Sequence, residues 1–230
     1  MAWKGKKMKT KVIKSNKQKI REMTILAMFI AIIAIMGFIP NLGFITIGLI
    51  SYTIIPIPVL IGGVLLGRKS AIWLGLAFGV VSMIRGATSA GFDYLFIFPW
   101  VSVLPRFIFG LVIYDIYRFF LKVIRIRFVA LVVSFFILSM IHSLLVLPML
   151  VTAFPIILGN ANMGSIVGSE VLAFISDSSS LSASIKLIFG ILISNSLIEA
   201  LLAASIGSII ADRLIAFRLL DTNNMETGEE

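Results

Sequence analysis

Long apolar runs alternate with short polar segments along this chain of 230 residues. A helix needs about 20 mainly apolar residues to cross the hydrocarbon core of a bilayer. Six segments meet or approach that length, and we predict that each forms a helix in the membrane. These segments are residues 23–39, 51–66, 70–84, 101–120, 128–151 and 187–210. The second and third are short, so we expect them to be tilted, re-entrant or not fully spanning. The pattern therefore predicts an all-α membrane protein built as a six-transmembrane-helix bundle.

The composition supports this class. Hydrophobic residues make up 59% of the chain and charged residues 13%, whereas a soluble domain carries about 25% charged residues. A soluble fold of this size keeps much of its chain at the surface and could not hide so much apolar area. The composition therefore argues against a soluble enzyme and against disorder. The lack of cysteine removes disulfide and thiolate chemistry, and a single histidine argues against a histidine-based metal cluster.

The basic residues predict the orientation. Nine of the 20 lysines and arginines lie in the first 21 residues, and 17 of the 20 lie on one side of the predicted spans. Basic residues stay on the cytoplasmic side, so we expect a cell-membrane protein with both termini in the cytoplasm. The first apolar run exceeds a typical signal-peptide core and lacks a convincing cleavage site, so we expect it to be retained. We thus predict a basic cytoplasmic segment (1–21), a transmembrane domain (22–218) and an acidic cytoplasmic tail (219–230).

Several kinds of chemistry leave no signal in the sequence. It contains no phosphate-binding P-loop, no H-E-x-x-H metalloprotease motif and no G-x-S-x-G nucleophile elbow. No helix carries a regular arginine ladder, and we find no convincing internal repeat of the kind seen in secondary transporters. The basic N-terminus lacks an accompanying aromatic pattern, which favours contact with anionic lipid over nucleic acid. The chain is therefore expected either to bind something in the membrane or to work with partners that supply energy.

The three loops predicted to face outward are apolar and contain glycine. They cover residues 39–50, 85–99 and 152–186. Such loops suggest lids or plugs that fold over a central pocket, although they could instead lie among the lipid headgroups. Arg85 and Asp93 flank part of the second loop and could simply pair with each other.

Four polar residues lie within predicted spans. A charge at the centre of a membrane helix costs about 2.5–3.5 kcal/mol on insertion scales, so it persists where it is paired or functional. Arg106, His142 and Glu199 lie in the fourth, fifth and sixth spans, and Asn195 shares a helix face with Glu199. We predict that these side chains converge on one substrate pocket open to the outside. Two alternatives remain: Arg106 and Glu199 form an internal ion pair, and His142 is a hydrogen-bonded core residue.

Two longer stretches resemble a known family. Residues 39–84 and residues 98–112, which include the sequence S-V-L-P-R, resemble the membrane substrate-binding (S) components of energy-coupling factor (ECF) vitamin transporters, and most closely the pantothenate-type group. An A-x-x-x-A pair, Ala27 and Ala31, lies in the first span. Alone this pair is a weak signal, because other small residues in the chain have the same spacing.

The resemblance implies a fold, partners and site residues. An S component of this kind is a six-helix bundle that captures a water-soluble vitamin from outside and has no enzymatic activity or cofactor of its own. Ala27 and Ala31 would dock on a transmembrane T component, while two cytosolic ABC ATPases use ATP to drive the cycle. Arg106 matches the arginine of the S-V-L-P-R sequence, and Asn195 and Glu199 match an N-x-x-x-E sequence in the last helix.

Three departures from the group's pattern bear on the substrate. The group tends to have H-I-P-V at residues 56–59, N-P-L at residues 98–100 and T-N-T at residues 141–143, where this chain has P-I-P-V, F-P-W and I-H-S. Pantothenate is the first expectation, because its carboxylate suits Arg106. A pyridoxine- or hydroxymethylpyrimidine-type ring is the second, because Phe98 and Trp100 add aromatic surface. Trp100 could instead anchor the helix at the membrane interface.

Two further classes of function remain as rivals. A membrane enzyme acting on lipid would call for a cluster of acidic or histidine residues at one interface, and the sequence shows none. A structural assembly subunit without ligand would not need Arg106, His142 and Glu199 buried together.

Overall fold

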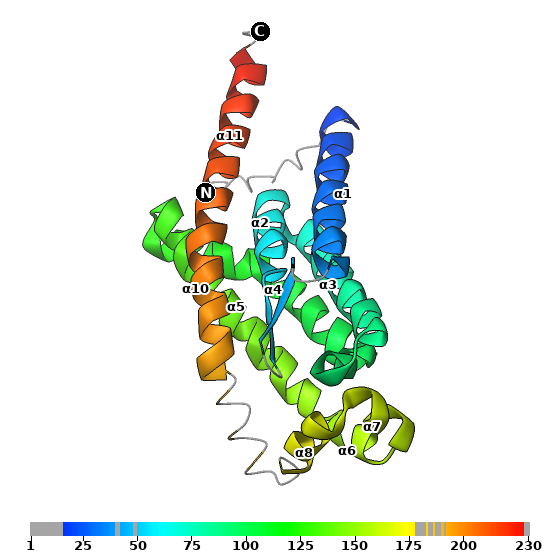
Figure 1. Cartoon of the computed structure of the whole chain (residues 1–230). Coiled ribbons are helices and arrows are strands. Elements are labelled where there is room, and N and C mark those ends of the chain that lie inside the picture. Colours follow the sequence, from blue (N-terminus) through cyan, green and yellow to red (C-terminus); the bar gives the residue numbers. More distant parts are fainter. Residues whose placement is uncertain are drawn as a thin grey trace, which may run out of the picture.

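The computed structural model describes residues 16–39, 42–47, 50–177 and 192–227, together with residues 183, 186 and 190. Within these ranges the regular secondary structure is helical apart from one hairpin (Figure 1). Its elements are α1 (Asn16–Phe38), β1 (Phe44–Ile47), β2 (Ile50–Thr53), α2 (Pro56–Leu66), α3 (Arg68–Thr88), the 3-10 helix η1 (Gly91–Ile97), α4 (Pro99–Ile124), α5 (Arg127–Val151), α6 (Phe154–Leu158), α7 (Ala161–Val167), α8 (Ser169–Asp177), the π-helical turn η2 (Leu192–Ser196), α10 (Leu197–Leu202), the π-helical turn η3 (Ala203–Gly207) and α11 (Ser208–Thr227).

Four helical segments in the described part of the chain are long and apolar enough to cross a membrane. They are Asn16–Phe38, Arg68–Thr88, Arg127–Leu158 and Ser194–Phe217. A fifth span exists if η1 and α4, which meet at an angle of 75°, are counted together. The structure thus supports a mainly helical membrane protein, while the count of six spans stays a prediction.

The predicted helix over residues 51–66 is wrong in its first part. Residues 50–53 form β2, which pairs antiparallel with β1 in a register that places Phe44 opposite Thr53. The helix begins only at Pro56, and proline suits the first turn of a helix because the amide hydrogen that it lacks would have no partner there. The β-branched and aromatic residues before Pro56 favour a strand. The remaining helix, α2, has 11 residues and is too short to span the bilayer.

Close backbone contact fixes α3 against α4. A Cβ atom on Gly75 would lie 2.4 Å from the Arg106 carbonyl oxygen, and one on Gly79 would lie 2.8 Å from the Val103 Cα atom. On the facing helix, a Cβ atom on Gly110 would lie 2.6 Å from the Ala71 carbonyl oxygen. Small residues four apart allow membrane helices to approach this closely. The contact places the first half of α4, which carries Arg106, firmly against α3.

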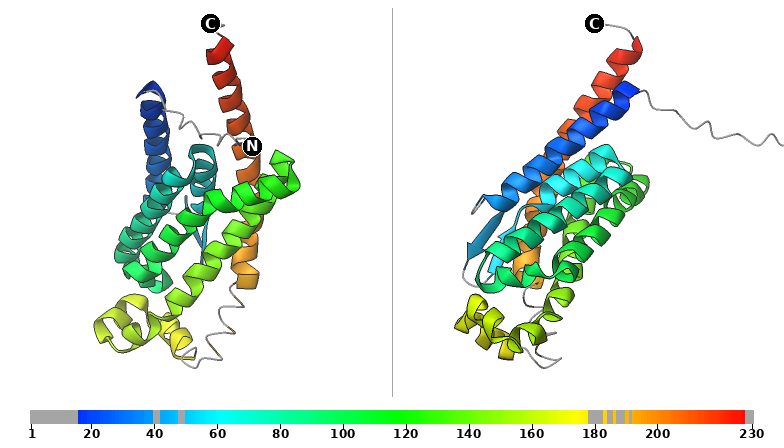
Figure 2. Two further views of the ribbon diagram at one scale, coloured as in Figure 1. Left: turned by 180° about the vertical axis from the view of Figure 1, so that it is seen from behind. Right: turned by 90° about the vertical axis from the view of Figure 1, so that its right-hand side faces the viewer.

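Two apolar clusters form the interior. The larger one is shared by α1–α5 and the last helical segments and includes Phe78, Phe109 and Phe135. The smaller one joins η1 to α6, α7 and α8 and includes Leu95 and Phe154. Helices α6–α8 gather at one end of the molecule, whereas the start of α1 and the end of α11 lie at the other end (Figures 1 and 2). The apolar sequence after residue 152 therefore folds, as far as residue 177, into short packed helices.

Among the described residues, two ion pairs join long α-helices to each other. Arg127 Nε lies 2.7 Å from Asp212 Oδ1 and joins α5 to α11, and Arg68 Nη2 lies 3.3 Å from Asp115 Oδ2 and joins α3 to α4. The basic run before residue 16 lies outside the described residues, and the backbone of residues 219–227 continues α11. The cytoplasmic location of both ends stays a prediction.

Candidate substrate-binding site

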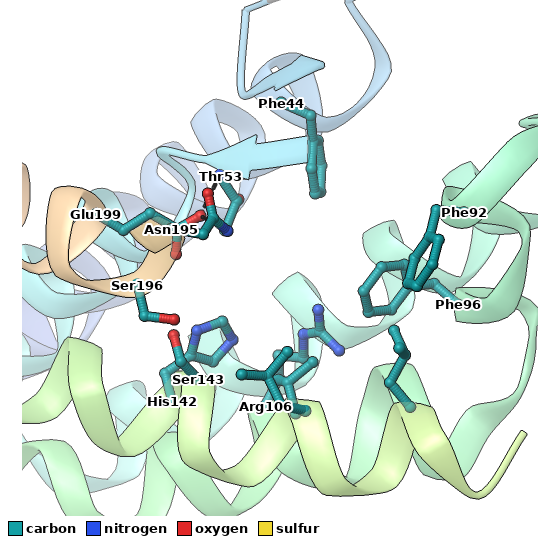
Figure 3. A pocket seen from close by; sticks show the side chains of 13 residues that line it. Phe44, Thr53, Phe92, Phe96, Arg106, His142, Ser143, Asn195, Ser196 and Glu199 are labelled. Atoms are coloured by element: carbon teal, nitrogen blue, oxygen red, sulfur yellow. Dashed lines mark hydrogen bonds between the residues drawn. The ribbon is translucent and has the colours of Figure 1, made fainter. Parts of the chain in front are cut away.

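A cavity lies where α4, α5 and α10 meet the hairpin and η1 (Figure 3). The centres of water-sized molecules can occupy about 90 Å³ of it. Polar side chains from α4, α5 and the η2–α10 segment surround one part, and phenylalanine rings from β1 and η1 surround the other. The lining residues are Phe44, Thr53, Phe92, Phe96, Arg106, His142, Ser143, Val146, Leu147, Leu150, Asn195, Ser196 and Glu199. All four polar residues predicted from the spans therefore lie at one cavity.

Arg106 is held in place by the carbonyl groups of its own helix. Its side chain is buried, and Nη1 donates to the carbonyl oxygens of Val101 at 2.7 Å and Ser102 at 3.2 Å. The Val101 carbonyl is available because the residue four positions later is Pro105, which has no amide hydrogen to donate. The guanidinium carbon also lies 4.8 Å from the centroid of the Phe96 ring. These contacts explain how the chain accommodates a buried cation beside the cavity.

Arg106 keeps hydrogen-bonding capacity for a ligand. Its Nε is buried without a hydrogen-bond partner in the part of the chain that the structure describes. In Figure 3 the guanidinium points into the space between His142 and Phe96. A guanidinium recognises carboxylate and phosphate groups through several parallel hydrogen bonds. The arrangement is therefore suited to an anionic group on a small molecule.

Glu199 and Asn195 form the opposite side of the cavity. Glu199 Oε1 accepts a hydrogen bond from the backbone amide of Thr53 at 2.6 Å and a longer one from Asn195 Nδ2 at 3.5 Å. Asn195 Oδ1 is buried and lacks a partner among the described residues. The Glu199 carboxylate thus ties α10 to the hairpin, while the neighbouring amide oxygen remains available to a hydrogen-bond donor.

His142 lies between two aromatic rings. Its ring centroid is 5.4 Å from that of Phe78 and 5.1 Å from that of Phe109. Both of its nitrogens are buried and have no hydrogen-bond partner in the described part of the chain. A buried polar group without a partner costs about 1–3 kcal/mol, so several such groups around one cavity call for a partner that the described residues do not supply.

The alternative internal ion pair is not formed in this structure. Among the described residues, Arg106 and Glu199 make no salt bridge to each other. They lie on different sides of the open space in Figure 3. The second alternative pair is formed, because Arg85 Nη2 lies 3.1 Å from Asp93 Oδ2.

Phe98 and Trp100 do not line this cavity. The two rings stack on each other with centroids 4.7 Å apart. Phe98 belongs to the smaller apolar cluster, and Trp100 is 40% exposed. The aromatic lining comes from Phe44, Phe92 and Phe96 instead, which the sequence reasoning missed. The only signal for them was the general aromatic and apolar character of the two outward loops.

Ala27 and Ala31 lie on α1 and do not line the cavity. Both are exposed and share one face of this helix, with Met28 and Ile32 beside them also exposed. The larger side chains of α1 that pack inward, such as Ile33, lie on another face. The small-residue pair is therefore accessible to another helix.

A family model for the ECF transporter substrate-specific component matches residues 21–211. The chain belongs to this family. No curated protein matches the chain. A substrate-specific component is the subunit of a membrane transporter that binds the solute, and its family is not an enzyme family. Membership implies association with a T component and ATPases in a membrane complex. The matched range of the substrate-specific component includes every residue that lines the cavity and the small-residue pair of α1.

Proposed function

We propose that this substrate-specific component captures a water-soluble vitamin from outside the cell, and that the vitamin is pantothenate. The observation that carries the proposal is the buried Arg106, which lines a cavity with hydrogen-bonding groups on its other side and whose Nε has no hydrogen-bond partner among the described residues. A solute with an anionic group at one end and hydroxyl or amide groups along its length fits that arrangement. Pantothenate has this chemistry.

Each polar group of the cavity has a role in this proposal. The carboxylate of pantothenate pairs with the guanidinium of Arg106, which is a charge-assisted contact. The hydroxyls and the amide of the vitamin meet Glu199, Asn195 and His142. The free oxygen of Asn195 accepts a hydrogen bond, and Glu199 can accept one from a hydroxyl while it keeps its contact with Thr53.

The cavity is narrow in the form described by the structure. The centres of water-sized molecules can occupy about 90 Å³ of the cavity. This volume is below the range of about 300–1,000 Å³ that is usual for small-molecule sites. We infer that loading the vitamin widens the cavity by moving lining elements. The hairpin and η1 are the candidates, because they supply Phe44, Phe92 and Phe96. In this way the outward loops act as lids.

A flat heteroaromatic ring is the second candidate substrate. Three phenylalanines line one part of the cavity, and aromatic rings pack well against flat ligands. Pyridoxine and hydroxymethylpyrimidine are vitamin-type molecules of this shape. This candidate no longer relies on Phe98 and Trp100, since both lie outside the lining.

The remaining parts of the cycle belong to partners. We propose that Ala27 and Ala31 contact the transmembrane T component and that two cytosolic ABC ATPases supply the energy of ATP hydrolysis, with no cofactor in this chain. Both ends of the chain would lie in the cytoplasm. The end of the molecule that carries η1 and α6–α8 would then face outward (Figure 1).

Equilibrium binding tests the proposal. The purified full-length chain in lipid nanodiscs is titrated with radiolabelled pantothenate, and unlabelled pyridoxine and hydroxymethylpyrimidine are used as competitors. We expect saturable binding at one site that the ring compounds displace poorly. Displacement by a ring compound at lower concentration than pantothenate would favour the second candidate. Failure of all three to bind would support the rival class, an assembly subunit without ligand.

A further inference from the structure

Arg85 is a second, largely buried arginine at the outward end of the molecule, and it does not line the cavity. It lies in the last turn of α3 and pairs with Asp93 of η1 at 3.1 Å. Their side chains are only 16% and 14% exposed. The pair therefore joins α3 to the segment that carries Phe92 and Phe96.

Arg85 also contacts the hairpin. Its guanidinium carbon lies 4.0 Å from the centroid of the Phe44 ring, and Phe44 is 5% exposed. A cation over an aromatic ring at this distance is an attractive contact. The ring of Phe44 lines the cavity and points into it in Figure 3. One guanidinium thus links the hairpin to η1 from behind the cavity wall.

The surroundings of Arg85 keep η1 in a fixed place. A Cβ atom on Gly86 would lie 2.7 Å from the Phe96 carbonyl carbon and 2.8 Å from the Ile97 nitrogen. The end of α3 is therefore in backbone contact with the end of η1, which positions Asp93 in the preceding turn. Arg85 and Asp93 are anchored to this contact, whereas Phe44 belongs to a hairpin.

Two contacts of described residues attach the hairpin at the two ends of its sequence. At its Thr53 end, the backbone amide donates to Glu199, a residue of the cavity itself. At its Phe44 end, the ring contacts Arg85, and Phe44 also belongs to the larger apolar cluster. The first point is within reach of a ligand in the cavity, and the second is shielded from it by Phe44. The two points can therefore be disturbed separately.

We propose that Arg85, Asp93 and Phe44 form a clamp that holds the hairpin closed over the cavity and thereby sets how fast a solute enters and leaves. Arg85 and Asp93 are positioning residues in this proposal, since they act through Phe44. The part that concerns solute exchange rests on the proposed function. The part that concerns the hairpin does not, because it can be measured without any ligand.

Amide hydrogen exchange of the full-length chain in nanodiscs tests the clamp. Exchange reports the local opening of a segment, and the Ile54 amide, which donates to the Gly43 carbonyl at 2.9 Å, lies in the hairpin. Asp93→Asn removes the charge that holds Arg85. We expect exchange across residues 43–54 to become at least about ten-fold faster, which corresponds to about 1.4 kcal/mol. Exchange in α5 should not change.

Asp115→Asn is the matched control. It removes the same kind of charge from the Arg68 pair, whose side chains are 60% and 51% exposed, and it should leave the hairpin unchanged. Phe44→Leu keeps an apolar side chain but loses the ring contact, so it should resemble Asp93→Asn. Unchanged exchange in both Asp93→Asn and Phe44→Leu overturns the clamp. Faster exchange throughout the molecule also overturns it, because the pair would then support the whole fold.

Release of radiolabelled pantothenate extends the test. In Asp93→Asn we expect the association and dissociation rates to rise together by about ten-fold, so that the dissociation constant changes little, because the cavity residues are untouched. If the hairpin opens but the unaltered chain binds no pantothenate, the clamp stands and the proposed substrate fails. If the unaltered chain binds pantothenate and its rates are the same in Asp93→Asn, the claim about solute exchange fails.

Discussion

Arg106 shows how one residue can be both buried and available. The proline before it leaves the Val101 carbonyl without a backbone donor, and Arg106 Nη1 takes that place at 2.7 Å. A second nitrogen of the same guanidinium, Nε, has no partner among the described residues. Pro105 thus frees a backbone carbonyl that holds one nitrogen of the Arg106 side chain, and another nitrogen of the same side chain remains free to bind a ligand. Pro105 and Arg106 are the last two residues of the S-V-L-P-R sequence.

The first prediction separates a binding role from a structural one for Arg106 and Glu199. Because the two side chains form no salt bridge with each other, we expect each single substitution to remove only its own proposed ligand contact and not an ion pair shared by both residues. A charged hydrogen bond to a ligand is worth about 1.5–3 kcal/mol. We therefore expect Arg106→Gln or Glu199→Gln to weaken pantothenate binding by about 10- to 150-fold with little change in melting temperature.

The double substitution and a control complete that experiment. Lys122→Gln changes an exposed charge at the far end of α4 and should alter neither quantity. If Arg106 and Glu199 instead only stabilised the fold as a pair, both single variants would lose stability and the double variant would regain it with unchanged affinity. That pattern would show that these two residues do not bind the solute.

The second prediction concerns Pro105. In Pro105→Ala the new amide can donate to the Val101 carbonyl and so compete with Arg106 Nη1. We expect an equal or higher melting temperature and several-fold weaker pantothenate binding, measured on the same samples. Pro148→Ala makes the same change inside α5 and should leave affinity closer to that of the original chain. Equal effects of the two substitutions on affinity would contradict the anchoring role of Pro105.

Four of the polar residues at the cavity could be predicted from the sequence, and its phenylalanine lining could not. Arg106, His142 and Glu199 are conspicuous because polar groups are costly within apolar spans. Phe44 and Phe96 lie in loops that are apolar throughout, so nothing marks them. Thr53 contributes its backbone amide, which any residue other than proline would also supply.

At the scale of elements, the length of an apolar run was a poor guide to its structure. Residues 50–66 form a mainly apolar run whose length suggests a membrane span. The run nevertheless contains a strand and a short helix. Pro56 marks the boundary, and the hairpin it creates brings Phe44 and Thr53 to the cavity. The long helices α1 and α5 were predicted more closely, because each contains a long unbroken apolar run. The segment over residues 70–84 was predicted as too short to be a clear span, whereas α3 runs from Arg68 to Thr88 and is long enough to cross a membrane.

The third prediction concerns the exposed face of α1. Ala27 and Ala31 leave a shallow, accessible surface that a partner helix can approach closely. Ala27→Trp or Ala31→Trp should abolish assembly with the T component, because a large side chain holds the helices apart. Binding of pantothenate to the isolated chain should survive. Co-purification of the variant with the T component and the ATPases measures the first effect.

A matched control distinguishes this surface from other lipid-facing positions. Leu144→Trp enlarges a residue of α5 that is 56% exposed, and it should not reduce assembly. Normal co-purification of both alanine variants would contradict the docking surface on α1. An equal loss of assembly in Leu144→Trp would mean that the effect is not specific to that helix.

At the scale of the whole molecule, the two ends of the bundle differ. The start of α1 and the end of α11 lie at one end, and α6–α8 lie at the other (Figure 2). The predicted orientation places the first end in the cytoplasm, where basic residues accumulate. The charges of the loops are the basis for that prediction.

The fourth prediction tests the orientation with introduced cysteines, since the chain has none of its own. A cysteine at Ser89, after α3, or at Ser179, which lies outside the described residues, should react with an impermeant maleimide added to intact cells. A cysteine at Ser15, also outside the described residues, or at Thr227 should react only after the cells are opened. The reverse labelling pattern would place the cavity on the wrong side for uptake.

The central claim is that the cavity beside Arg106 binds a small, water-soluble solute. Mass spectrometry of small molecules that co-purify with the full-length chain tests it without assuming which solute is bound. We predict that one vitamin-sized molecule with an anionic group, pantothenate, is enriched with the unaltered chain and lost from Arg106→Gln, while Lys122→Gln retains it. Equal retention by Arg106→Gln, or no enriched molecule from the unaltered chain grown with the vitamin, would contradict the claim.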